Sequence, residues 1–307
     1  MKPQQDDGIN LVYWELAGFI EQELSAMTDN IVSNYADNVR KRANNPFLRF
    51  NNSSINKYMA LGRSLDSQLG NRLQRIILHI ARVKYGLLRV PNVVSIDVAN
   101  EAERNIVCKL YSVPFVVPAS MRNNGFNPYQ QAIYIGCNKS DRDIKRILKI
   151  KARADVLQTA SFSFNRISEE ALQHIKSKSG RRILVDLLFF DCPNDTLNNA
   201  NAFEIKMGGN LDTKNARSNA DEVKELSNIF GFLPANFAYF ATCYGTCSES
   251  VADKVTEVMG ENALLNGRQF WDKVIPSTPE TFDYEDFIRV YNRAFLLSNI
   301  EARLREL

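Results

Sequence analysis

The sequence is poor in histidine, and it contains no long apolar run. Two histidines in 307 residues leave few imidazole groups for a general base or a metal site. The five cysteines are scattered and odd in number, which argues against a disulfide framework and favours a reducing compartment. No apolar run approaches the roughly 18 residues of a membrane-spanning helix, and residues 1–7 lack the apolar core of a secretory signal. We therefore expect a cytoplasmic protein with no membrane partner.

Several large enzyme classes have no motif in this chain. There is no P-loop, no G-x-G-x-x-G and no G-x-S-x-G, so nucleotide hydrolysis, dinucleotide cofactors and serine hydrolysis have no local support. Cys243 and Cys247 have zinc-like spacing, but no second pair matches them. Free cysteines at a strand end are the simpler interpretation.

The composition is that of a globular protein, with 45% hydrophobic and 24% charged residues. We expect one domain over 1–307, with a helical N-terminal arm at 1–60, a core at 61–275 and a C-terminal helix at 276–307. Hydrophobic periodicity predicts several elements. Helices are expected at 10–43, 55–83 (capped by Gly86), 213–229, 248–259 and 284–305, and strands at 183–190, 202–207 and 237–244. The segments 93–98, 106–111 and 132–136 are expected to be short strands or irregular loops. The fold class is therefore α/β, with a central mixed sheet flanked by helices.

Charge is unevenly distributed along the chain. The whole protein carries only +3, but residues 139–182 hold twelve Lys and Arg against five acids, a net +7. Within this stretch, apolar and basic residues alternate from 144 to 151, which predicts an amphipathic helix with a cationic face. Such a face could contact DNA phosphates, or it could simply be solvated.

Three charged residues are predicted to meet on one β-hairpin. Asp186 stands inside an otherwise apolar strand, where an unpaired carboxylate would cost several kcal/mol. Glu204 and Lys206 are two residues apart on the next strand and so share a face. If the two strands pair, Asp186 lies beside Glu204.

This trio suits phosphodiester hydrolysis. Two carboxylates are hard oxygen ligands for Mg²⁺. An ammonium group beside them could orient the attacking water and stabilise the pentacovalent state at phosphorus. The alternative is a surface hairpin with an incidental Glu-x-Lys. The pair Gly208-Gly209, which follows Lys206 after the single residue Met207, favours a site.

The arrangement Asp186…Glu204-Ile205-Lys206 resembles the PD-(D/E)xK nuclease motif of type II restriction endonucleases, with Val185 where a proline is usual. Residues 61–71 resemble the N-terminal helix of such enzymes, 207–215 their polar turn after the lysine, and 267–272 an element of enzymes that read interrupted GG-N-CC palindromes. The resemblance covers about 61–75 and 183–275. It implies a restriction-endonuclease-like fold, Asp186 and Glu204 as Mg²⁺ ligands, Lys206 as the water-orienting group and Asp66 as an additional helix-borne acid. Asp66 could equally be a solvated helix residue.

The resemblance also implies a function and partners. It predicts Mg²⁺-dependent, sequence-specific cleavage of double-stranded DNA that leaves 5′-phosphates, in a prokaryotic restriction-modification system with a cognate DNA methyltransferase. A palindromic site implies a homodimer. A repair or junction-resolving nuclease and a non-catalytic DNA-binding protein remain alternatives. The candidate DNA-binding residues are Lys145, Arg146, Lys149, Lys214, Asn215 and Arg217.

Overall fold

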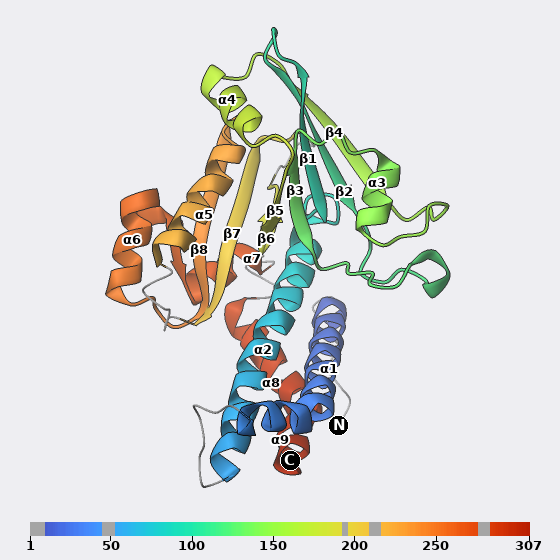
Figure 1. The fold of residues 1–307 in the computed structure, drawn as a ribbon, viewed down its shortest axis with the longest axis vertical. Coiled ribbons are helices and arrows are strands. Elements are labelled where there is room, and N and C mark those ends of the chain that lie inside the picture. Colours follow the sequence, from blue (N-terminus) through green and yellow to red (C-terminus); the bar gives the residue numbers. More distant parts are fainter. Residues whose placement is uncertain (1–9, 45–52, 192–195, 209–215, 276–282) are drawn as a thin grey trace. The chain divides into compact units, whose positions relative to one another are not determined.

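The computed structural model describes residues 10–44, 53–191, 196–208, 216–275 and 283–307, with side chains from residue 15 onward. The chain divides into two compact units. The helical unit comprises residues 1–80 and 275–307, and the α/β unit comprises residues 81–274. Figure 1 shows the helices and strands of both units in chain order. The expectation of a single domain stays a prediction.

The helical unit is built on two long helices, α1 (Asn10–Ala43) and α2 (Ser53–Tyr85). The residues of α2 from Ala81 onward belong to the α/β unit. Both helices confirm the spans predicted from periodicity, and Gly86 ends α2 with a left-handed φ of 89°. Ile20, Leu24 and Ile31 are fully buried or nearly so along α1. The predicted last helix is divided into α8 (Tyr284–Leu297) and α9 (Ile300–Arg305), because Asn299 adopts a left-handed φ of 53°.

A five-stranded mixed sheet opens the α/β unit. Its order is β4-β2-β1-β3-β5, and only β1 and β3 run parallel. One face packs on α3 (Asp141–Ile147), through a cluster that includes Val93, Tyr134 and Ile144. The opposite face shares a core with α4 (Glu169–Ser177) and with the second sheet. The strands are β1 (Val93–Asn100), β2 (Asn105–Ser112), β3 (Gln131–Ile135), β4 (Gln158–Phe164) and β5 (Arg181–Val185).

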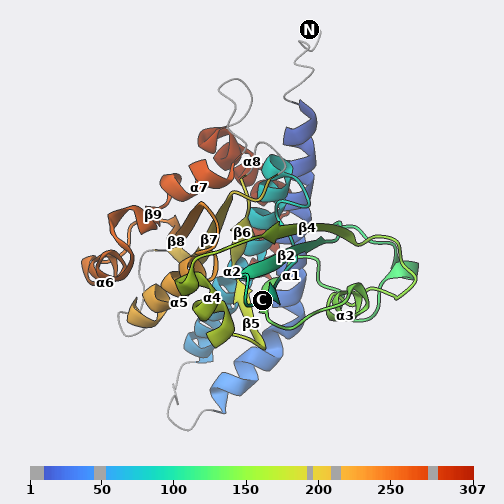
Figure 2. The same ribbon diagram turned by 90° about the horizontal axis from the view of Figure 1, so that it is seen from above.

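A four-stranded mixed sheet, in the order β6-β7-β8-β9, completes the unit. β6 (Leu187–Phe189) pairs antiparallel with β7 (Asn199–Gly208), as the predicted hairpin requires. β7 then connects through α5 (Ala216–Ile229) to the parallel strand β8 (Ala235–Tyr244). Figure 2 shows α5 lying alongside β7 and β8. The remaining elements are α6 (Glu249–Met259), β9 (Leu264–Asn266), α7 (Arg268–Val274) and short 3-10 turns at Ala119–Met121 and Glu261–Ala263.

Two sequence predictions about the sheets need correction. The fold is α/β with mixed sheets flanked by helices, but the strands form two sheets instead of one central sheet. The predicted strand 183–190 is interrupted at Asp186, because β5 pairs with β3 in the first sheet while β6 pairs with β7 in the second. Asp186 therefore stands where the chain passes from one sheet to the other.

The basic stretch 139–182 is also different from the prediction. Its helix, α3, has only seven residues and ends at Ile147. Ile150 instead forms an isolated bridge with Arg122, and Lys149 has a left-handed φ of 56°. Among the described helices, none is long and apolar enough to cross a bilayer.

Candidate active site

The Asp186 carboxylate is held beside the strand that carries Glu204. In the β6–β7 pair, Leu187 lies opposite Phe203, so the next step of the antiparallel register sets Asp186 opposite Glu204. The backbone N–H of Ile205 donates a hydrogen bond of 2.8 Å to Asp186 Oδ2. The hairpin interpretation of the sequence is confirmed, and it brings the first two members of the trio together.

Gln131 fixes the segment that follows Asp186. Its Nε2 donates to the carbonyls of Pro91 (2.6 Å) and Leu188 (2.8 Å), and its Oε1 accepts from the N–H of Leu188 (2.8 Å). Gln131 is buried, and it belongs to β3 of the five-stranded sheet. One amide side chain therefore ties the first sheet to β6, two residues beyond Asp186.

Glu204 and Lys206 share one face of β7, as the alternation of strand side chains predicts. Lys206 Nζ lies 2.6 Å from Glu204 Oε1. The Glu204 side chain is 17% exposed and that of Lys206 is 29% exposed, so both remain partly accessible to a ligand. Phe203 points to the opposite face, where its ring packs on that of Phe270 in α7. An apolar face thus anchors the strand while its polar face carries the site.

The carboxylates repel each other. Burial, followed by the negative charge of Glu204, raises the pKa of Asp186 from 3.8 to about 6. Glu222 on α5 raises it further, while the Ile205 N–H and the Lys206 ammonium oppose the shift. Lys206 thus compensates only part of the negative charge, and a cation bound here would relieve the remainder.

A pocket of about 870 Å³ opens beside Glu204, lined by residues from β5, α5 and the end of α4. Arg217 reaches it from the first turn of α5, where it lies 3.5 Å from Asp221. Lys178 is paired with Glu225 at 2.6 Å. Arg181 and Arg182, at the start of β5, add two further exposed cations. The pocket therefore places several guanidinium groups next to an acidic centre.

The donor set fits a hard cation. Asp186 and Glu204 offer carboxylate oxygens, and Mg²⁺ commonly takes one or two carboxylates while keeping several waters. Within the described ranges no group of three His, Cys, Asp or Glu residues is arranged around a common metal position. Burial raises the pKa of the nearby Cys243 thiol to about 12, so this sulfur stays protonated and is a poor ligand.

The structure distributes the other predicted residues widely. Of the candidate DNA-binding residues that the structure describes, Arg217 alone lines the pocket with Glu204. Lys145 and Arg146 lie on α3 and Lys149 just after it, and α3 packs on the face of the five-stranded sheet opposite the core shared with α5. Lys214 and Asn215 lie outside the described residues. Asp66 is exposed on α2 in the helical unit, and its role stays a prediction.

Sequence reasoning missed three residues near the site. Arg181 and Arg182 were counted only as part of the basic stretch, although their place directly before the strand leading to Asp186 could have drawn attention to them. Gln131 carries no local signal, because its role depends on a strand 57 positions away. In comparisons with known proteins, no family model, curated protein or solved structure matches this chain.

Proposed function

We propose that the protein is a Mg²⁺-dependent endonuclease that cleaves double-stranded DNA at a specific sequence, as type II restriction enzymes do. The observation that carries the proposal is the convergence of Asp186, Glu204 and Lys206 on one face of the β6–β7 pair. The adjoining pocket, lined by Arg181, Arg182 and Arg217, supplies cations that could hold phosphate oxygens.

In this proposal each side chain has a defined task. Asp186 and Glu204 would hold Mg²⁺, which would supply activation of water and neutralise charge on the phosphate. Lys206, held by Glu204, orients the attacking water and stabilises the negative charge that develops at phosphorus. Arg217 positions the phosphodiester from the α5 side of the pocket. The product would be a 5′-phosphate end.

The wider assignments follow from the same family resemblance. A palindromic target is matched by a homodimer that supplies one site for each strand. Restriction of foreign DNA in a prokaryotic cytoplasm would require a methyltransferase that protects the host sequence. These partners belong to the proposal together with the cleavage reaction.

Plasmid digestion in the presence of Mg²⁺ tests the proposal. Discrete bands that require Mg²⁺ and disappear in EDTA support sequence-specific cleavage. Smears or cuts confined to branched DNA would indicate a repair or junction-resolving nuclease instead. Absence of any cleavage, with DNA binding intact, would indicate a non-catalytic DNA-binding protein.

Lys206→Ala tests the site itself. We expect cleavage to fall by at least about 100-fold, the range seen when a single group that stabilises transition-state charge is removed, while DNA affinity is retained. Lys224→Ala is the matched control, because Lys224 is an exposed lysine on α5 that does not line the pocket. Cleavage by Lys206→Ala at the wild-type rate would remove the trio from the mechanism.

A further inference from the structure

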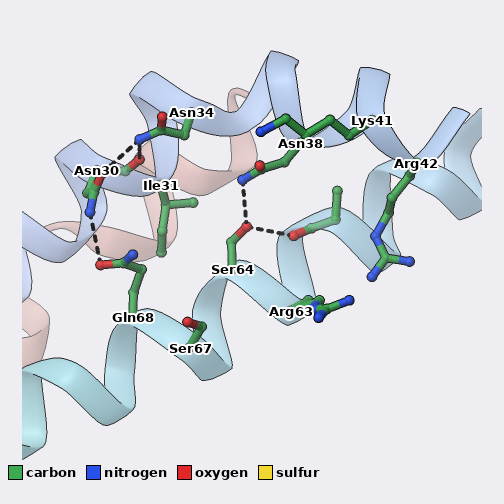
Figure 3. Close-up of a pocket in the computed structure, with 11 residues that line it drawn as sticks. Asn30, Ile31, Asn34, Asn38, Lys41, Arg42, Arg63, Ser64, Ser67 and Gln68 are labelled. Atoms are coloured by element: carbon green, nitrogen blue, oxygen red, sulfur yellow. Dashed lines mark hydrogen bonds between the residues drawn. The ribbon is translucent and has the colours of Figure 1, made fainter. Parts of the chain in front are cut away.

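A second polar pocket lies entirely within the helical unit. It has a volume of about 540 Å³ and is formed between α1 and α2 (Figure 3). Of its eleven lining residues, nine are polar or cationic and none is a carboxylate. The proposed catalytic centre lies in the other unit, so this pocket, hereafter the α1–α2 groove, is a distinct feature of the chain.

The α1 side of the groove is a regular stripe. Asn30, Asn34, Asn38 and Arg42 recur at four-residue intervals, which places them one above another along one helix face. Such a stripe is usually apolar where two helices face each other. Here the stripe is polar, and only Ile31 and Ala60 among the lining residues of the groove are apolar.

Hydrogen bonds across the seam hold the amides in place. Asn30 Nδ2 donates to Gln68 Oε1 at 3.0 Å, and Asn38 Nδ2 donates to Ser64 Oγ at 3.2 Å. Ser64 in turn donates to the Ala60 carbonyl. Figure 3 shows these contacts spanning the two helices. The groove therefore has a wall of fixed amide and hydroxyl groups.

Three cations stand at one end of the groove without compensating acids. Lys41 and Arg42 come from the last turn of α1 and Arg63 from α2, and Figure 3 shows Arg42 and Arg63 extending toward each other. Within the described residues none of the three forms an ion pair. By contrast, Arg40 on the same turn is paired with Asp37, and Arg72 is paired with Glu23 at 2.8 Å. Like charges gathered in this way favour a bound anion.

We propose that the α1–α2 groove binds backbone phosphates of duplex DNA, so that the helical unit supplies phosphate contacts separate from those beside Glu204. Arg, Lys, Asn, Gln and Ser are the side chains that contact phosphate oxygens in protein–DNA complexes, and all five types line this groove. The choice of DNA as the source of phosphate rests on the proposed function. A discrete phosphate ligand would use the same donors.

The test measures the salt dependence of DNA binding by the full-length chain in EDTA, using fluorescence anisotropy of a labelled duplex. The Arg42→Gln/Arg63→Gln variant should reduce the magnitude of the negative slope of log affinity against log salt by roughly 2, because each lost phosphate contact contributes about 0.9. The matched control is Arg40→Gln/Arg289→Gln, which removes two exposed arginines of the helical unit that pair with Asp37 and Asp286. This control should leave the slope unchanged.

Further arms separate folding from binding and DNA from free phosphate. Arg42→Lys/Arg63→Lys retains the charge and should restore most of the slope, which a folding defect would not allow. Equal slopes for the Gln variant and its control would overturn the proposal. Calorimetry with inorganic phosphate provides the last arm. Phosphate binding that needs Arg42 and Arg63, without any change in DNA binding, would overturn the assignment to DNA. If the Gln variant loses salt dependence as expected but the wild-type chain does not cleave DNA, the nuclease proposal fails and the proposal for the groove stands.

Discussion

Replacing Asp186 by Asn should make the metal-free protein more stable while it destroys the proposed metal site. Burial and the charge of Glu204 raise the pKa of Asp186 from 3.8 to about 6, so the ionised side chain is disfavoured in the folded protein. Each pKa unit corresponds to 1.36 kcal/mol. Ionised Asp186 therefore lowers the free energy of unfolding by about 3 kcal/mol. An asparagine Oδ1 can still accept the hydrogen bond from the Ile205 N–H, so the exchange removes charge without orphaning that donor.

The sign of the pH dependence follows from linkage. Between pH 4 and 6 the folded protein holds a proton on Asp186 that the unfolded chain has lost, so wild-type stability decreases as the pH rises through this window. The advantage of Asp186→Asn should be near zero at pH 3.5, about half of its maximum near pH 5 and complete, at about 3 kcal/mol, above pH 7. Mg²⁺ should then stabilise the wild type but not the variant, since only the wild type retains both carboxylates.

Urea denaturation followed by tryptophan fluorescence gives the required measurement. The chain has two tryptophans, Trp14 and Trp271. In a Trp14→Phe background the remaining Trp271, buried in α7 with its Nε1 donating to the Cys243 carbonyl, reports on the α/β unit. Asp253→Asn, at an exposed aspartate of α6, is the control and should change little. A pH-independent difference, or an Asp186→Asn protein no more stable than wild type at pH 8, would refute the raised pKa of Asp186.

Two further substitutions probe the surroundings of Asp186. Glu204→Gln removes the neighbouring negative charge, so it should lower the pKa of Asp186 and shift the stability transition of the previous experiment to lower pH. It should also abolish stabilisation by Mg²⁺. An unchanged transition would show that burial alone sets the pKa of Asp186. Gln131→Leu leaves the buried Leu188 N–H, the Leu188 carbonyl and the Pro91 carbonyl without their present partner, and at about 1–3 kcal/mol for an orphaned group it should cost about 3 kcal/mol or more and lower cleavage. Gln130→Leu, at the neighbouring position, should have a small effect in both assays.

Local patterns predicted the elements whose partners lie nearby in the sequence. Periodicity was enough to predict the two long helices, the strand Ala235–Tyr244 and the Glu204/Lys206 face of β7, because each depends on which residues share one face. The pairing of Asp186 with Glu204 was also accessible, because only a hairpin loop separates them. Short-range alternation was therefore enough to predict that Asp186, Glu204 and Lys206 lie together.

The break at Asp186 could not be predicted from periodicity. Residues 183–190 have the composition of one continuous buried strand, yet β5 pairs with Gln131–Ile135 and β6 with β7. The two strands pair with different parts of the chain, and the Gln131 amide holds Leu188 by two hydrogen bonds. No periodicity within the strand encodes such a partner. The break has a chemical consequence, because it leaves the polar Asp186 between β5 and β6 and opposite Glu204.

The basic stretch 139–182 shows why net charge along a sequence is a weaker guide than its placement on a fold. The cations from 145 to 149 accompany α3, on one face of the five-stranded sheet, whereas Lys178, Arg181 and Arg182 line the pocket beside Glu204. One run of charge is thus divided between two surfaces by the strands inside it. In the α1–α2 groove the cations come from two separate segments, since Lys41 and Arg42 belong to the short basic run that ends α1 and Arg63 lies on α2, and the pairing of the two helices brings them together. If phosphate contacts come from both places, then the salt slope of DNA binding should fall by separate increments when Arg181 and Arg182, or Arg42 and Arg63, are neutralised, and the two increments should add because the pairs share no partner.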